Sequence, residues 1–78
     1  MELEIITPEK DLFKGEVDLV QLPGIDGSFE ILNNHAPLIS VLTTGKIKVK
    51  KKGGKEEYFE INGGVIEVLK NHILILVE

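Results

Sequence analysis

Two histidines and thirteen acidic residues are the side chains that could do acid–base or metal chemistry in this sequence. Acid–base catalysis needs such a group beside a nucleophile or a second acid, and zinc needs three or four nitrogen, sulfur or carboxylate ligands. His35 lies in a turn before Ala36-Pro37, and His72 follows Asn71 at the start of an apolar run. Neither histidine lies in a recognisable pattern with a nucleophile, a second acid or further metal ligands, and the chain has no cysteine. The sequence therefore predicts a non-catalytic protein without a metal or cofactor.

The charged residues argue against nucleic acid and nucleotide partners. The net charge is −4, and all nine basic residues are lysine, so no guanidinium can bind phosphate or guanine in a bidentate way. Neither glycine-rich phosphate-binding motif, GxxxxGK[ST] or GxGxxG, is present. Six lysines lie between Lys46 and Lys55, alternating with apolar residues and followed by glutamates. They form either a charge-paired face of a hairpin or an anion-binding surface.

The stretch from Leu22 to Ser40 contains two turns around one short apolar segment. Asp26 and Glu30 stand beside apolar residues in and after the first turn, and His35 lies in the second. The first turn is either a local turn with its aromatic residue in the core or a docking surface, because rigid exposed loops commonly bind partners. His35 either holds its own turn together or contacts a partner.

Apolar residues recur with a period of two, and no segment has the spacing of an amphipathic helix. We therefore expect residues 1–78 to form a single all-β domain with no substantial helix. Strands are expected at residues 2–6, 12–22, 28–32, 38–42, 46–52, 56–61, 65–69 and 72–77. The second segment should bend or contain a bulge and belong to two sheets, which favours a sandwich over a closed barrel. The nearly continuous apolar character of residues 72–77 suits a strand covered on both faces or at a subunit contact.

The hairpin around Gly53-Gly54 has a predictable register. A loop of residues 53–55 would place Ile47 opposite Ile61 and Val49 opposite Phe59 on the inner face. It would also pair lysines with glutamates outside, with Lys48 opposite Glu60 and Lys52 opposite Glu56.

Three sequence segments together resemble one family, the N-terminal β-sandwich domain of the ε subunit of F-type ATP synthase, which is called δ in mitochondria. The segments are LPGIDGSFEIL at residues 22–32, NHAPLISVLTTGKIKV at 34–49 and INGGVIEVLKNHILILVE at 61–78. The resemblance covers the whole chain. It implies a sandwich of about ten strands in a non-catalytic rotor subunit of the central stalk, which clamps the γ subunit to the ring of c subunits and couples proton-driven rotation to ATP synthesis.

The resemblance also implies partners, sites and a location. Contact with the c ring falls on Asp26, Gly27, Ser28, Phe29 and Glu30, with His35 beside them, and contact with γ falls on Thr7 and Ser40. The family usually has glycine at the position of Glu30. The implied location is the cytoplasmic face of a bacterial inner membrane, where the subunit is peripheral and held through the complex.

Two further expectations concern the end of the chain and the competing function. The family commonly continues into a C-terminal helical hairpin that restrains ATP hydrolysis, whereas this sequence ends at Glu78, so we expect rotational coupling without inhibition through that hairpin. The acidic N-terminal residues do not resemble a signal peptide, and no apolar run is long enough to span a membrane. The competing function is a free-standing β module that binds a small ligand or peptide, which would need a concave apolar pocket.

Overall fold

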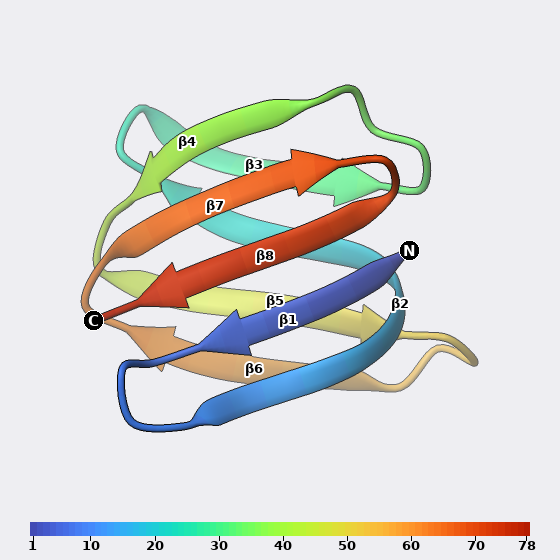
Figure 1. Cartoon of the computed structure of the whole chain (residues 1–78), viewed down its shortest axis with the longest axis horizontal. Coiled ribbons are helices and arrows are strands. Elements are labelled where there is room, and N and C mark those ends of the chain that lie inside the picture. The colour runs from blue at the N-terminus through green and yellow to red at the C-terminus, as the bar shows by residue number, and fades with distance from the viewer.

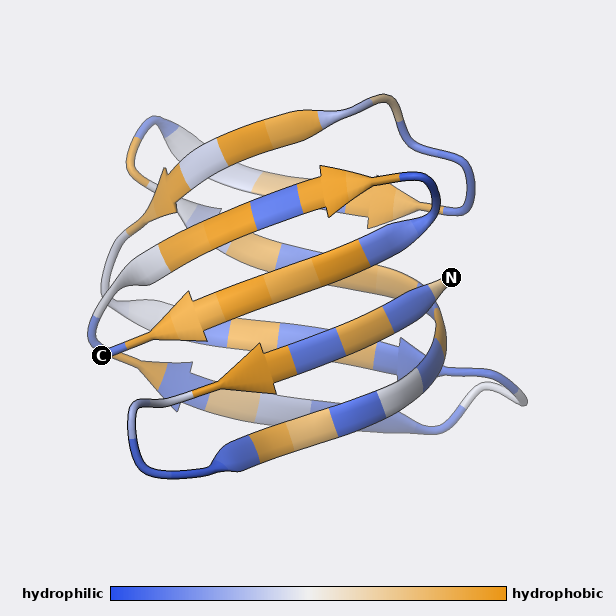
Figure 2. Cartoon of the chain, in the orientation of Figure 1, coloured by the Kyte–Doolittle hydropathy of each residue, from blue (hydrophilic) through white to orange (hydrophobic).

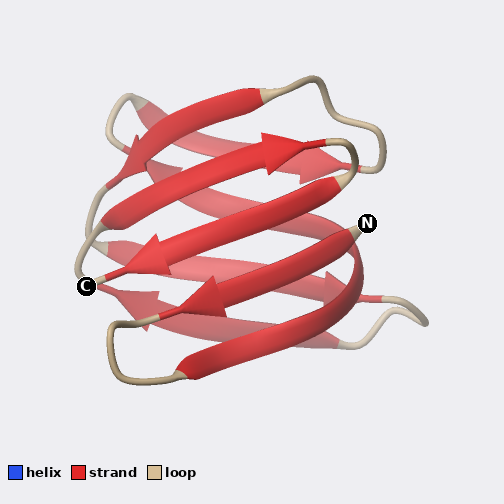
Figure 3. Ribbon diagram, viewed as in Figure 1, coloured by secondary structure: helices blue, strands red, loops and turns tan.

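The computed structural model describes all residues from Met1 to Glu78 as an all-β domain (Figures 1 and 3). Its eight strands are β1 (Glu2–Ile6), β2 (Asp11–Gly24), β3 (Gly27–Leu32), β4 (Leu38–Leu42), β5 (Gly45–Lys51), β6 (Glu56–Ile61), β7 (Gly64–Leu69) and β8 (His72–Val77). Every expected strand is confirmed, with bounds that differ by at most two residues. No helix in the structure is able to cross a membrane. The structure has eight strands instead of the roughly ten that the resemblance implied, and part of the difference is that β2 is a single strand of 14 residues that runs through both layers.

Strand β2 runs through both layers of the fold. Its first half pairs with β1, from Asp11 to Glu16, and its second half pairs with β5 on one side and β3 on the other. The register with β5 shifts between Val17 and Leu19, so the strand has a bulge there. The bulge predicted for this segment is therefore confirmed and lies at Asp18, while the strand belongs to two layers of one sheet instead of two separate sheets. A bulge increases the local twist, which allows one strand to pass from one layer of the fold to the other.

The strands form one continuous hydrogen-bonded sheet that folds over itself into two layers (Figure 1). The first layer, in the order β4-β7-β8-β1, ends with the first half of β2. The second layer has the order β3-β2-β5-β6. Strand β4 pairs with β2 through only one residue pair, Gly24 with Leu42, at the corner between the layers. Each layer has an inner face toward the other layer and an outer face that no other strand of the chain covers.

The core between the layers contains only apolar side chains. Sixteen buried hydrophobic residues form one cluster, and no polar or charged residue is buried. The buried side chains alternate with outward ones along most strands, as in β8, where Ile73, Ile75 and Val77 point inward. Burial of an aliphatic side chain contributes about 1.5–3 kcal/mol relative to exposure, so this alternation decides which face of each strand points inward.

The predicted register of the β5–β6 hairpin is wrong by two residues. Ile47 lies opposite Phe59 instead of Ile61, and Val49 lies opposite Glu57. The inner and outer faces are nevertheless as predicted, since a shift of two residues leaves every side chain on its own face. The loop consists of residues 52–54, because the Lys51 amide donates to the Lys55 carbonyl at 2.7 Å.

This register also changes the ion pairs of the hairpin. Lys48 pairs with Glu56 at 3.4 Å, and Lys51 pairs with Glu57 at 2.7 Å, whereas the predicted pairs Lys48–Glu60 and Lys52–Glu56 do not form. Such exposed pairs contribute only about 0.2–1 kcal/mol each, so they follow the register instead of deciding it.

Candidate functional site

The first turn of residues 22–40 is an exposed loop whose backbone is held on two sides. Ile25 and Asp26 form its tip between β2 and β3, and the Ile25 side chain is 61% exposed. The Ile25 amide donates to the Val41 carbonyl at 3.3 Å, which attaches the loop to β4. Gly27 has a φ of 125°, a value that glycine adopts without strain. The loop is thus a stiff projection with one apolar and one acidic side chain at its tip.

The residues after this tip divide between the two faces of β3. Ser28 and Glu30 are exposed, while Phe29 is half buried and packs against the core. The ring of Phe29 therefore anchors the loop from inside, which is one of the two interpretations of this segment. Asp26, Gly27, Ser28 and Glu30 remain accessible to a partner.

His35 does not lie beside this loop, and that expectation is wrong. It follows β3, whereas Asp26 precedes it, so the two turns lie at opposite ends of a six-residue strand (Figure 1). At about 3.3 Å per residue, the strand separates them by roughly 17 Å. His35 Nδ1 lies 2.7 Å from the Ala36 carbonyl oxygen, so its ring is held against its own turn.

The His35 turn is joined to the β7–β8 turn instead. The Asn34 amide donates to Oδ1 of Asn71 at 2.8 Å, and both residues have positive φ, 64° and 62°. Asparagine tolerates this conformation better than most residues. A hollow between the two turns is bordered by His35 and Leu69, among other residues. His35 is thus placed near the outer face of the first layer.

The two residues expected to contact γ are largely engaged within the fold. The Thr7 hydroxyl donates to the Lys10 carbonyl at 3.0 Å and accepts from the amides of Glu9 and Lys10, which closes the β1–β2 turn. Ser40 is half buried and shares the inward face of β4 with buried Leu42. A partner could reach Ser40 only along the edge of β4.

The outer face of the first layer is strongly apolar, and most of this surface was not predicted from the sequence. Figure 2 shows hydrophobic residues along β4, β7 and β8 beyond what the core requires. The exposed side chains on this face, which we call the apolar face, are Ile39 (73%), Val41 (50%), Val65 (41%), Leu69 (51%) and Leu76 (50%), with Leu74 half buried among them. The signal was present in residues 72–77, which are apolar at inward and outward positions alike. Of the two alternatives for residues 72–77, coverage on both faces is wrong, because the outer side of β8 is uncovered, and a subunit contact stays a prediction.

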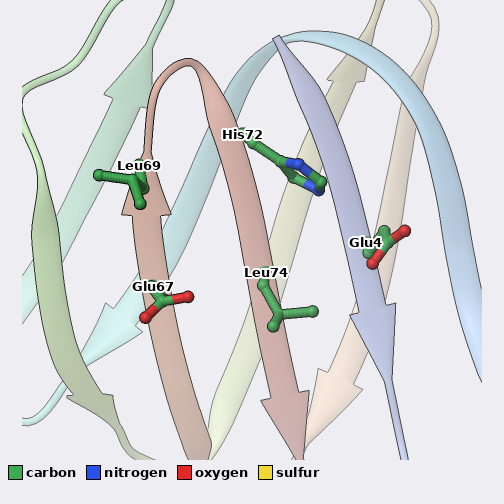
Figure 4. A pocket seen from close by; sticks show the side chains of 5 residues that line it. All are labelled: Glu4, Glu67, Leu69, His72 and Leu74. Atoms are coloured by element: carbon green, nitrogen blue, oxygen red, sulfur yellow. The ribbon is translucent and has the colours of Figure 1, made fainter.

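The cross-strand registers set the neighbours on the apolar face. Glu67 of β7 lies between Ile39 of β4 and Leu74 of β8, and Glu4 of β1 follows Leu74. A hollow of about 190 Å³ lies among Glu4, Glu67, Leu69, His72 and Leu74 (Figure 4). No three histidine or acidic side chains in the chain are arranged to hold a metal ion. The hollow thus combines apolar walls with carboxylates at its rim.

The surface hollows do not favour a ligand-binding module. Their volumes range from about 190 to 570 Å³, and all four are open to solvent. A small-molecule site normally encloses most of its ligand in a concave apolar cleft. An exposed apolar sheet face, by contrast, is typical of a surface that binds another protein.

Known proteins resemble this chain over its whole length. The family described as the beta-sandwich domain of the ATP synthase Delta/Epsilon chain matches residues 1–78. The ATP synthase epsilon chain of Chlorobium limicola is 43% identical over 77 residues, covering 99% of this chain and 88% of that one. The corresponding chain of Leptospira borgpetersenii is 44% identical over 78 residues, covering 100% of this chain and 61% of that one.

Two solved structures resemble the fold. A chain of the Euglena gracilis mitochondrial ATP synthase superposes with a TM-score of 0.90 at 23% identity, covering 96% of this chain and 48% of that one. A chain from the central stalk and c ring of the Tetrahymena thermophila mitochondrial ATP synthase gives 0.83 at 23% identity, with 99% and 62% covered. This chain therefore spans about half to three fifths of those chains, and the likeness concerns the fold.

Proposed function

Because this chain belongs to the family of the ATP synthase delta/epsilon β-sandwich domain and is an epsilon-chain homologue, we propose that it clamps the γ subunit to the c ring in the central stalk. The epsilon chain is a non-catalytic subunit of the enzyme. In this role the domain couples proton-driven rotation of the ring to ATP synthesis in the catalytic head. A densely packed sandwich suits the task, since close-packed interiors have low compressibility and transmit strain.

The observation that supports a clamp is the presence of two contact surfaces of different character. The Asp26 loop with Glu30 presents polar groups, and the outer side of the first layer presents the apolar face. The two surfaces adjoin where the Ile25 amide meets the Val41 carbonyl, so partners of different chemistry would bind beside one another. A ligand-binding module would have no need of two such surfaces.

We assign the loop surface to the c ring. Asp26, Gly27, Ser28 and Glu30 are exposed there, and the backbone contact with Val41 keeps the loop in place. Acidic and hydroxyl side chains on a rigid loop can bind polar loops of a ring subunit with little loss of conformational entropy. Phe29 supports the contact from the core.

We assign the apolar face to γ. Ile39 and Val41 flank Ser40 on β4 and point outward, so a subunit that covers this face and extends over the edge of β4 also reaches Ser40. His35 borders the same region through the hollow beside Leu69 and belongs with this surface instead of the loop. Thr7 lies in the β1–β2 turn, which its hydroxyl closes, and its contact with γ is part of the same proposal.

The two contacts imply a location. A domain held between γ and a membrane-embedded ring is peripheral to the membrane, and its homologues include bacterial chains. We therefore propose that it lies at the cytoplasmic face of a bacterial inner membrane. Membrane association then comes through the complex alone.

The test is to measure binding to purified γ and to purified c ring separately. Asp26→Lys with Glu30→Lys should weaken binding to the ring and leave γ bound, while Ile39→Asp should weaken binding to γ and leave the ring bound. Circular dichroism and thermal unfolding confirm that each variant is folded. If the unaltered chain binds neither γ nor ring, the proposal is wrong.

A further inference from the structure

One acidic residue, Glu67, occupies the middle of the apolar face. Its neighbours across the sheet are Ile39 on one side and Leu74 on the other, and Val65 and Leu69 precede and follow it on the same face of β7. Figure 4 shows Glu67, Leu69 and Leu74 on this surface. A carboxylate is thus enclosed on four sides by aliphatic side chains while it remains open to water in front.

No ion pair forms between Glu67 and a basic group of the chain, and the basic side chain that borders the same hollow is His72. The four ion pairs of the structure involve Glu4, Glu16, Glu56 and Glu57. Glu4 lies in the same cross-strand row as Glu67 and has Lys14 at 3.5 Å. Of the two carboxylates in this row, Glu4 is paired with a lysine, whereas Glu67, which has aliphatic neighbours, is not.

A subunit that covers the apolar face removes water from this carboxylate. Burying an ionised carboxylate without a partner is strongly unfavourable, whereas a cation from the partner offsets the cost with a charge-assisted hydrogen bond. We propose that Glu67 determines which surface can dock here: an apolar surface with one lysine or arginine positioned opposite Glu67. The inference rests on the proposed function in that it takes γ to be the occupant.

The same residue disfavours pairing between two copies of the chain. In a face-to-face contact with twofold symmetry centred on the apolar face, each Glu67 would meet the Glu67 of the other copy. Two carboxylates would then be desolvated side by side without a cation, which costs several kcal/mol in such interfaces. Glu67 thus disfavours self-association through the apolar face, which leaves this face free to bind γ.

The binding experiment compares Glu67→Gln and Glu67→Lys with the unaltered chain against purified γ from the same organism. Glu67→Lys should reduce affinity by at least about tenfold, Glu67→Gln should reduce it less, and the salt dependence of binding should weaken in both. Glu60→Lys is the matched control, because Glu60 is exposed and unpaired on the outer face of the other layer. It should bind γ as the unaltered chain does.

A charge exchange identifies the partner cation. Replacing individual lysines and arginines of γ by glutamate should reveal one position that restores binding to Glu67→Lys. Equal binding of γ by the unaltered chain and Glu67→Lys would overturn the inference and leave the proposed function standing.

The second experiment needs no γ. Sedimentation equilibrium should show Glu67→Leu self-associating at concentrations where the unaltered chain and Glu60→Leu are monomeric. A monomeric Glu67→Leu would overturn the inference. Failure of the unaltered chain to bind γ would instead overturn the proposed function, so the two failures are distinguishable.

Discussion

The ring of Phe29 occupies the space that a side chain on Gly24 would need. A Cβ on Gly24 would lie 2.8 Å from Cε1 of Phe29 and 2.7 Å from the carbonyl oxygen of Gly27. Gly24 ends β2, pairs with Gly27 across the turn and with Leu42 across the corner of the sandwich. This close approach joins the candidate c-ring loop to the core, so the loop position depends on the absence of a side chain at one residue.

Gly24→Ala should therefore destabilise the domain by about 1–3 kcal/mol, since both the ring and the backbone oxygen would have to move. Urea denaturation followed by circular dichroism measures the change. Gly15→Ala is the control, because a Cβ there meets only Phe13 atoms, the nearest at 3.6 Å, an ordinary contact. Equal stability of the Gly24 and Gly15 variants would contradict this account of the loop.

Asn71→Ala should destabilise the junction of the two turns by about 1–2 kcal/mol, because it removes the hydrogen bond to the Asn34 amide and places alanine at positive φ. Asn71→Gly removes only the hydrogen bond, and Asn71→Asp retains an acceptor. Hydrogen exchange at the Asn34 amide should accelerate in the alanine and glycine variants and stay slow in the aspartate variant. Unchanged exchange in Asn71→Gly would argue against the bond.

Phe13 and Phe59 join β2 to β6 where the two layers meet. Their ring centroids lie 5.9 Å apart at an interplanar angle of 67°, an edge-to-face geometry. Aromatic pairs of this kind contribute about 0.5–1.5 kcal/mol beyond their buried area. A double-mutant cycle with Phe13→Leu and Phe59→Leu, measured by urea denaturation, should give a coupling energy in this range. Strictly additive effects would show that the rings act only through burial.

Asp26→Lys combined with Glu30→Lys should weaken c-ring binding by about tenfold or more while changing the free energy of unfolding by less than about 0.5 kcal/mol, because both side chains are exposed and unpaired. Binding to purified c ring and thermal unfolding measure the two effects. Glu9→Lys with Glu60→Lys changes the net charge equally at other exposed positions. A similar loss of binding in that control would mean that overall charge, not the loop, governs the contact.

The alternation of apolar residues was sufficient to predict the strands and their faces. The β5–β6 hairpin shows the limit of that pattern. Alternation excludes a register that is shifted by one residue, because that shift would turn the inward side chains outward. It does not exclude a register that is shifted by two residues, because Ile47 and Val49 still point inward. The loop geometry decided the outcome, with Gly53 and Gly54 both at positive φ.

The candidate sites were predictable only in part, for a similar reason. The exposed Asp26 loop followed from its turn residues, whereas the separation of His35 from that loop depends on how β3 extends between the two turns. The apolar face could not be assembled from sequence, because Ile39, Glu67 and Leu74 come together only through pairing of β4, β7 and β8.

An all-β domain could be predicted from the sequence alone, because period-two alternation and turn chemistry are local properties of the chain, and the resemblance of three segments to one family gave its membership. The folded arrangement was needed to show that the outer side of β4, β7 and β8 is an uncovered apolar surface with Glu67 at its centre. Outward positions do not face the core that selects inward residue types, so a surface made of them is recognisable only when strands distant in sequence lie side by side.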